Sequence, residues 1–453
     1  MRAPREILLT LARAKREVGL FSADHPTGAA AVEEAHRILG SVLAGQPQLR
    51  IVVHEEAFYI ARMLLLEESV RLDAFLTDLI ERGISVVDFT AGLTVWELSR
   101  FLDLLNLPVT ETRRVGATAY LRQHRVRHIS IRPSRSLTPD DLADLTSSPT
   151  DLYRAGMRVV AGLYFQAAHG LPLMLKHAHK VVGFLARSLA EDPVPLLSLT
   201  ALRTYDEESI HHPLNMAILA LAMGVRARLD PPRLMVLGLA ALLHDIGKAR
   251  LPSGLLTRPW ELGDDERAIA QRHPVHGAFI LRHLTAEQRL AMVVAFEHHV
   301  GYDRSGYPAL EAKSLPSPWS RVVAVLEFYD AAAHVRRPHR LPMLPSDAIR
   351  FLLDEAGRRF DPVAVQVLVG VVGLYPIGSL VELSTGALGV VLRPGRRDPA
   401  RPTVRIVRGP GGAVVDAAVI DLTEAPDLEI IRALDPAREA VDPLAYLPLP
   451  ARS

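Results

Sequence analysis

Histidines beside acidic residues are the part of this sequence best suited to chemistry. Eight of the 18 histidines fall between His211 and His299, at expected helix ends and not in one tract. His244 and Asp245 close an apolar helical segment, so both side chains can turn toward one point. His298 and His299 are consecutive, about 100° apart on a helix, which suits a cluster of ions better than a single ion.

Further residues extend this pattern. Glu208 and His212 are four positions apart, hence on one helical face. His273 stands before Pro274 at an expected helix start. The acidic run that contains Glu208 has a second interpretation, a solvated helix start. A set of imidazoles and carboxylates without cysteine suits two or three ions such as manganese, iron or zinc.

The composition excludes several classes of protein. The chain has 453 residues, 49% of them hydrophobic and 23% charged, with no cysteine. It is therefore not disordered or collagen-like, and it has no disulfide, cysteine-zinc site or iron–sulfur cluster. The formal net charge of +1 gives no global electrostatic case for a nucleic-acid partner. No segment reaches the roughly 18 apolar residues of a membrane span, and we expect a cytoplasmic protein.

The first third of the chain predicts an α+β accessory domain over residues 1–133. Residues 4–18 and 30–43 have helical apolar spacing, while residues 49–60, 84–89 and 126–131 are rich in β-branched and aromatic side chains. Residues 134–150, with their serine, threonine, aspartate and proline content, read as a linker. No catalytic spacing stands out in this part.

The rest of the chain changes character twice. Residues 151–374 repeat apolar positions at helical spacing, including two long stretches over 152–189 and 266–284. Residues 375–424 carry short β-type runs separated by glycine and proline, among them 413–420, which suits a small β module. Residues 425–453 predict a short helix and a tail. The fold class is therefore multidomain and mainly α.

Four ordered motifs within residues 200–370 resemble the HD-GYP family of bacterial phosphodiesterases. They are His244-Asp245-Ile246-Gly247-Lys248, His273-Pro274, His298-His299 and Asp303-Arg304-Ser305-Gly306-Tyr307-Pro308. The resemblance implies an all-α HD domain with two or three divalent ions, most often iron or manganese. It also implies hydrolysis of cyclic di-GMP to pGpG or GMP in second-messenger signalling.

Carried over position by position, the resemblance implies a metal-ligand set in which Asp245 bridges ions. The set is Glu208, His212, His244, Asp245, His273, His298, His299 and Glu327. Glu327 stands where the family has aspartate, and a position behind the ligands is the alternative for it, because a buried glutamate needs a partner. The expected chemistry is attack on phosphorus by water that the metals activate.

The resemblance also implies contacts with substrate. Asp245 and Lys248 would be catalytic, with Lys248 offsetting charge on the scissile phosphate. Arg336 falls at a phosphate-binding position, and the second basic position is His339. With one inserted residue, Arg337 and Arg340 take these two positions instead. Tyr307, in the Gly306-Tyr307-Pro308 loop, would line the mouth of the site and could meet a signalling partner.

The chain departs from the family pattern at Val300, Arg304, Glu327 and His339. These departures support an alternative, a catalytically degenerate sensor or scaffold that binds a nucleotide or a protein partner. A further alternative is an HD phosphohydrolase that acts on another phosphoester. The Gly306-Tyr307-Pro308 loop argues against this last hypothesis, since simpler HD hydrolases lack it.

Overall fold

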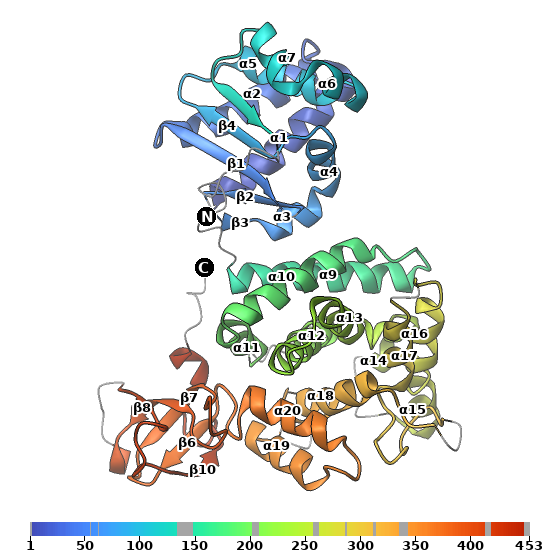
Figure 1. Ribbon diagram of the computed structural model, residues 1–453, viewed down its shortest axis with the longest axis vertical. Coiled ribbons are helices and arrows are strands. Elements are labelled where there is room, and N and C mark those ends of the chain that lie inside the picture. Colours follow the sequence, from blue (N-terminus) through green and yellow to red (C-terminus); the bar gives the residue numbers. More distant parts are fainter. Residues whose placement is uncertain are drawn as a thin grey trace. The chain divides into compact units, whose positions relative to one another are not determined.

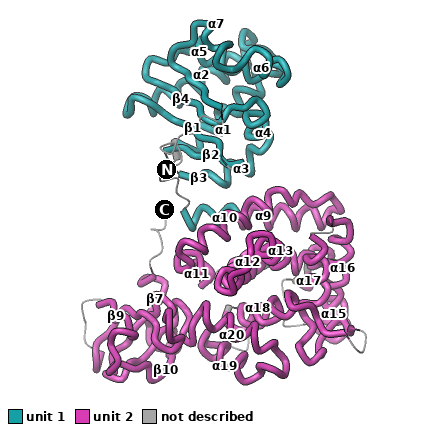
Figure 2. Tube along the Cα trace, viewed as in Figure 1, with its two compact units in different colours: residues 1–155 teal, residues 156–453 magenta. Residues whose placement is uncertain are grey.

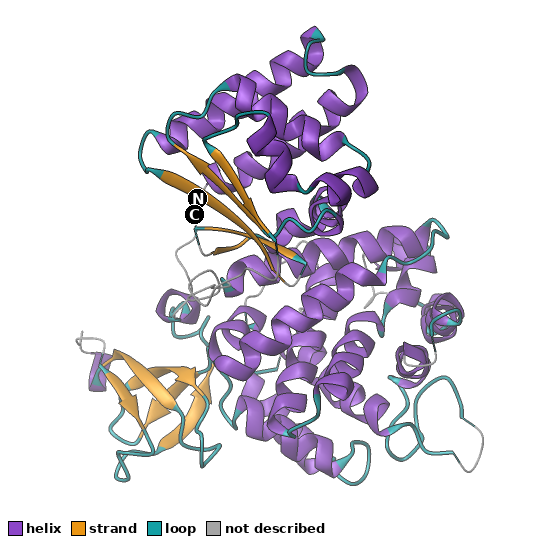
Figure 3. Cartoon of the chain, turned by 45° about the horizontal axis from the view of Figure 1, so that its top comes forward, coloured by secondary structure: helices purple, strands orange, loops and turns teal. Residues whose placement is uncertain are grey.

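The computed structural model describes residues 2–54, 56–61, 63–133, 148–201, 208–256, 262–285, 288–310, 314–334, 343–412 and 418–447. The chain divides into two compact units, Met1–Ala155 and Gly156–Ser453 (Figure 2). The strands gather in two sheets, one in each unit (Figure 3). Among the described residues, no helix is both long enough and apolar enough to cross a bilayer. The expected fold class, a helical domain flanked by an α+β region and a small β module, is confirmed.

The N-terminal unit packs helices on an antiparallel sheet of order β3-β2-β1-β4-β5 (Figure 1). Its strands are β1 (Gln48–His54), β2 (Ala57–Ile60), β3 (Met63–Leu64), β4 (Val86–Thr90) and β5 (Ile129–Arg132). Its helices are α1 (Arg2–Phe21), α2 (Pro26–Leu43), α3 (Leu66–Arg71), α4 (Asp73–Glu81), α5 (Val95–Asn106), α6 (Val109–Val115) and α7 (Ala117–Gln123). Buried side chains such as Leu8, Leu39, Phe58 and Phe89 join helices and sheet in one core.

The β-type stretch over residues 49–60 forms two strands, because a turn divides it. Strands β1 and β2 pair antiparallel, with Ile51 opposite Ile60. Glu56, between them, has a φ of 56°, a left-handed conformation that a continuous strand does not contain. The apolar pattern identified the strands, but it carried no signal for this turn.

The second unit is mainly helical. Helix α9 (Pro149–Ala168) begins within the expected linker, whose residues 134–147 lie outside the described part of the chain. It is followed by α10 (Leu175–Glu191), α11 (Val194–Thr200), α12 (Glu208–Arg226), α13 (Pro231–Leu243), η2 (Ile246–Arg250), α14 (Ser253–Leu256), α15 (Asp264–Ala270), α16 (His273–Leu281), α17 (Arg289–Glu297), α18 (Pro318–His334), α19 (Pro345–Asp354) and α20 (Pro362–Val372).

Two long helical stretches of the sequence are each broken into two helices. Residues 152–189 form α9 and α10, separated by a turn at Gly170, whose φ is 70°. Residues 266–284 form α15 and α16, and Pro274 occupies the first turn of α16. Proline suits that first turn because it has no N–H to leave unbonded. The break places His273 at a helix start.

Helix ends bring the chemistry-bearing residues together. Asp230 caps α13 by accepting a hydrogen bond from the backbone N–H of Arg233, and the helix ends directly before His244. The following 3-10 turn η2 lies so close to α16 that a Cβ on Gly247 would be 1.9 Å from the carbonyl oxygen of His273. Only glycine permits this approach, and it sets Asp245 beside the start of α16.

The chain ends in a small antiparallel sheet of order β10-β6-β7-β8-β9. Its strands are β6 (Leu380–Leu383), β7 (Leu388–Arg393), β8 (Thr403–Arg408), β9 (Val419–Asp421) and β10 (Ile430–Leu434), followed by the 3-10 turn η5 (Pro443–Tyr446). Of the strand expected over 413–420, residues 413–417 lie outside the described part of the chain. Residues 425–453, where a short helix and a tail are expected, also contain strand β10, which pairs with β6 and has Leu434 opposite Leu380; the helical turn is η5.

Replacing Gly247 by alanine should destabilise the helical unit. The new Cβ would lie 1.9 Å from the carbonyl oxygen of His273 and 2.4 Å from the nitrogen of Gly277, so backbone must move. We expect the melting temperature to fall by about 5 °C or more, which corresponds to roughly 2 kcal/mol. Scanning calorimetry measures this change.

Gly183→Ala is the matched control for this substitution. Gly183 lies within α10, and its added Cβ would have only the Met235 sulfur within 4 Å, at 3.9 Å. Alanine in a helix is more favourable than glycine by about 1 kcal/mol, so the melting temperature should hold or rise. Equal melting of the Gly247→Ala and parent proteins would contradict the close approach of η2 and α16.

Candidate metal centre

Four histidines around Asp245 each have their Nδ1 in a hydrogen bond. Nδ1 of His244, His273 and His298 donates to a backbone carbonyl one turn earlier, at 2.7, 2.8 and 3.0 Å. Nδ1 of His212 lies 2.7 Å from Oδ2 of Asp330. Carbonyl and carboxylate oxygens accept, so each Nδ1 carries the hydrogen and the neutral ring has its lone pair on Nε2. The same bonds orient histidine ligands in metal proteins.

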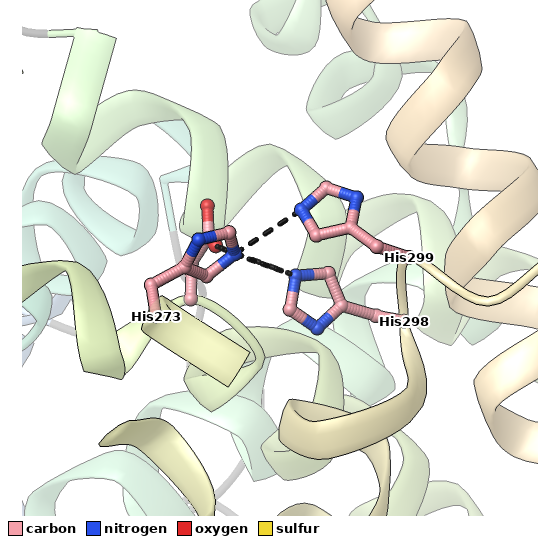
Figure 4. A group of neighbouring side chains, drawn as sticks. His273, His298 and His299 are labelled. Carbon is pink, nitrogen blue, oxygen red and sulfur yellow. Dashed lines mark hydrogen bonds and ion pairs between the residues drawn. The ribbon is translucent and has the colours of Figure 1, made fainter. Parts of the chain in front are cut away.

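The first ligand group consists of Asp245, His273, His298 and His299. Nε2 of His273 lies 3.2 Å from Nε2 of His298 and 3.1 Å from Nε2 of His299 (Figure 4). Oδ1 of Asp245 lies 3.2 Å from the same His273 nitrogen. One ligand atom from each residue falls within 4.8 Å of all the others, so the group could hold a metal ion.

The second ligand group consists of His212, His244, Asp245 and Glu327. Nε2 of His212 lies 3.2 Å from Nε2 of His244 and 2.9 Å from Oε2 of Glu327. Nε2 of His244 lies 3.3 Å from the same Glu327 oxygen. These atoms also fall within 4.8 Å of one another. The longer carboxylate of glutamate therefore reaches the histidines from α18.

Asp245 belongs to both groups and divides its two oxygens between them. Oδ1 is 3.2 Å from Nε2 of His273, while Oδ2 is 3.5 Å from Nε2 of His244. The residue is 1% exposed, and Oδ1 accepts no hydrogen bond from the described residues. Nitrogen lone pairs about 3 Å apart repel one another and the nearby buried carboxylate oxygen, and a cation between them removes this repulsion. The residues present therefore fit bound metal ions.

Positive partners keep the carboxylates of Asp245 and Glu327 ionised. Burial alone would raise the pKa of Asp245, but Lys248 and His244 outweigh burial and hold it well below its usual range. Burial also opposes ionisation of Glu327, and His212 holds the pKa of that carboxyl well below its usual range. Both groups thus present carboxylates in the form that binds cations.

The histidines of the two groups differ in protonation. Burial lowers the pKa of His298 to about 4 and that of His299 well below its usual range. These rings are neutral at pH 7 and ready to act as ligands. Burial also disfavours the charged form of His212, but Glu327 and Asp330 outweigh it and raise its pKa. The carboxylates around His212 therefore favour positive charge in the second group.

Lys248 and Tyr307 border these groups. The ammonium of Lys248 forms an ion pair with Oδ2 of Asp245 while its side chain stays 32% exposed. Burial would lower the pKa of Lys248, but Asp245 and Glu327 raise it above its usual range. The ring of Tyr307 lies 4.6 Å from that of His299, centroid to centroid. A fixed cation and a phenol thus stand beside the ligand groups.

The loop that carries Tyr307 depends on glycine. Gly306 has a φ of 95°, and a Cβ there would lie 2.1 Å from the carbonyl oxygen of His299. Val300, one of the departures from the family pattern, is 1% exposed and forms an isolated β-bridge with Gly306. Arg304, another departure, has a φ of 68°. Glycine is the favoured residue at such an angle, so this loop retains a glycine-type backbone without the glycine.

Some predicted site residues fall outside the described structure. Glu208 begins α12, but its side chain is not among those described. Arg336, Arg337, His339 and Arg340 all lie in the undescribed range 335–342. The structure brings together the other predicted site residues: His212, His244, Asp245, Lys248, His273, His298, His299, Tyr307 and Glu327.

Two residues of this site were not predicted from the sequence. Asp330 accepts the hydrogen bond that orients His212, and its spacing of three residues from Glu327 on α18 is a signal that could have identified it. Tyr164 on α9 is close enough that Asp245 and Glu327 act with burial to raise its pKa. A single tyrosine on an apolar helix gives no such signal in the sequence.

Comparisons with known proteins agree with this geometry. Residues 185–363 match the HD domain family, and residues 380–441 match a KOW domain associated with the HD domain. "Cyclic di-GMP phosphodiesterase PA4108" of Pseudomonas aeruginosa is 30% identical over 352 residues, which cover 78% of this chain and 80% of the relative.

Other relatives match shorter parts. "Cyclic di-GMP phosphodiesterase response regulator RpfG" of Xanthomonas campestris is 34% identical over 31% of this chain and 37% of its own. "3'3'-cGAMP-specific phosphodiesterase 2" of Vibrio cholerae is 33% identical over 29% of this chain and 25% of its own. The ordered motifs, the HD domain match and the long alignment lead to one conclusion: this chain belongs to the HD-GYP family.

Proposed function

We propose that this protein is a metal-dependent phosphodiesterase that hydrolyses cyclic di-GMP to pGpG or GMP. The observation that carries the proposal is the pair of ligand groups that share the buried Asp245. Relatives named cyclic di-GMP phosphodiesterases support the substrate, one of them along 78% of this chain. A cytoplasmic location goes with the proposal, because the substrate is an intracellular messenger.

The two ligand groups would hold the ions, with Asp245 bridging them. Divalent ions bound there supply Lewis acidity, which activates water and neutralises charge on phosphate oxygens. Iron and manganese suit the imidazole and carboxylate donors. Glu208 stands four residues before His212. It would add one more carboxylate ligand beside the second group, which could then hold a third ion.

Lys248 would act on the substrate itself. Its ammonium is held by Asp245 and remains partly exposed, so it can meet a phosphate oxygen while staying charged. A preorganised cation favours the transition state, in which negative charge on the phosphate grows. Tyr307 would present its phenol at the edge of the same site, and Arg336 would add a second cation for phosphate. The loop of Tyr307 would also offer a contact for a signalling partner.

The scaffold alternative rests on the departures from the family pattern. Three of them leave the described ligand groups intact: Glu327 contacts two histidines, Val300 supports the loop, and Arg304 keeps the backbone angle. Two ligand groups that share one carboxylate favour turnover over a purely structural role. They are the reason we place the phosphodiesterase first.

Product analysis tests the proposed activity. The protein, reconstituted anaerobically with Fe(II) or Mn(II), should convert cyclic di-GMP to pGpG or GMP, and chromatography resolves these products. Asp245→Asn should lose both metal and turnover, because it removes the oxygen charge shared by the two groups. The same assay with 3'3'-cGAMP defines the substrate preference. Metal-loaded protein that leaves cyclic di-GMP intact would favour the scaffold alternative or another phosphoester.

Glu327→Gln should empty one ligand group and spare the other. The amide keeps the shape of the side chain but loses the charge that faces His212 and His244. We expect about one metal equivalent per chain to be lost, as measured by elemental analysis after gel filtration. Loss of all metal would mean that the two groups do not bind ions separately. Unchanged metal content would assign Glu327 a position behind the ligands.

Lys248→Ala should retain metal and lose turnover. Removing one fixed cation from a phosphate site lowers kcat by roughly 100-fold. The matched control is Arg233→Ala, which removes an exposed cation paired with Asp230 at the start of α13 and should leave kcat unchanged. If Lys248→Ala hydrolyses the substrate at the parent rate, its phosphate role is wrong.

A further inference from the structure

A cavity separate from the two ligand groups lies within the second unit, between helices and the small sheet. Its volume is about 1020 Å³, and α11, α12, α18, α19, α20, β6, β10 and the segment after β10 contribute to its wall. The residues of the two ligand groups do not line it. Cavities that hold small organic molecules have volumes of roughly 300–1,000 Å³. The space is therefore large enough for a ligand of several hundred daltons.

Two hydroxyl groups in the cavity wall have unused hydrogen-bonding capacity. Ser346 on α19 is 1% exposed and Ser379, just before β6, is 5% exposed. Both line the cavity, and neither Oγ has a hydrogen-bond partner among the described residues. A buried hydroxyl without a partner costs about 1–3 kcal/mol. Two such groups facing one cavity indicate a ligand that bonds to them.

The rest of the wall is partly apolar. Leu219, Tyr329, Ile377 and Leu380 line the cavity and are each at most 7% exposed. A ligand that fills this space would bury apolar surface against them, at about 25 cal/mol per Å². The occupant is therefore expected to have an apolar body with a small number of polar groups.

Charge in the wall limits the occupant further. Four carboxylates line the cavity, from Asp347, Asp435, Glu439 and Asp442, against the guanidiniums of Arg432 and Arg438. Both arginines already have carboxylate partners: Nε of Arg432 lies 2.7 Å from Oε2 of Glu382, and Nε of Arg438 lies 3.6 Å from Oδ2 of Asp435. Glu439 is itself paired with Arg408. Among the described residues that line the cavity, carboxylates still outnumber guanidiniums by four to two, so an anion would meet an excess of negative charge.

We propose that this cavity is a binding site for a neutral or cationic small molecule with an apolar body, which bonds to Ser346 and Ser379. The anionic dinucleotide that we assign to the metal centre does not match it. Tyr329 lines the cavity from α18, the helix that also carries Glu327 and Asp330. A ligand here would therefore bear on the element that positions the second ligand group.

The absence of cysteine from the chain gives a direct test in the full-length protein. Ser379→Cys and Ser346→Cys each place one thiol in the cavity wall. The probes are two thiol reagents of similar size, the cationic 2-aminoethyl methanethiosulfonate and the anionic 2-sulfonatoethyl methanethiosulfonate. Ser384→Cys, at an exposed serine outside the cavity wall, is the matched control. Mass spectrometry measures each labelling rate.

We expect the cationic reagent to label Ser379→Cys at least about 5-fold faster than the anionic one, relative to the same ratio at Ser384→Cys. The difference should shrink in high salt. Equal ratios at the two positions, or faster anionic labelling, would overturn the charge assignment. If neither reagent labels the folded Ser379→Cys protein, although both label it when it is unfolded, the proposed site is wrong.

Two further readouts keep the test decisive. Ser346→Cys repeats the measurement from α19, so a folding defect in one variant, seen as a lowered melting temperature, leaves the other to decide. Labelling uses no phosphodiesterase activity, so its failure is distinct from failure of the proposed function. The cationic adduct should also change the rate at which a chelator removes metal at least 2-fold. An unchanged rate would overturn the link through α18.

Discussion

The structure depends on one buried carboxylate. Asp245 is 1% exposed and lies at the centre of two histidine groups, with Lys248 beside it. Burial of an unpaired carboxylate costs several kcal/mol, so the surrounding elements must supply compensating positive charge. Protonated imidazole, ammonium and metal ions can each do this. The helical unit is arranged so that these partners converge on a single residue.

For these partners to converge on Asp245, backbone segments must lie very close to one another. Glycine allows this at two positions. Gly247 lets η2 lie against the start of α16, which holds His273, and Gly306 lets the tyrosine loop lie against His299. Glu297 adds a third tie, since its carboxylate accepts hydrogen bonds from Ser317 N and Ser320 Oγ, both at 2.7 Å. These contacts fix the end of α17, where the paired histidines begin.

Sequence reasoning was strongest where residue type and helix ends coincide. The pairs at 244–245 and 298–299 follow apolar helices, and in the structure both pairs contribute to the two ligand groups. It failed where tertiary contacts decide the structure. Strand β10 forms because its backbone pairs with β6. Tyr164 comes under the electrostatic influence of Asp245 and Glu327 because of where the fold places α9. In both cases the interacting residues are far apart in the sequence, so no local pattern could reveal the contact.

Helix α18 connects the two ligand sites that we propose. Glu327 and Tyr329 are two residues apart, about 200° around the helix, so they face nearly opposite sides. Glu327 contacts His212 and His244, while Tyr329 lines the separate cavity. Helices shift as whole elements in conformational transitions. In our proposal, a ligand that displaces Tyr329 therefore also displaces the Glu327 carboxylate, and a neutral or cationic occupant does so without competing for the site of an anionic substrate.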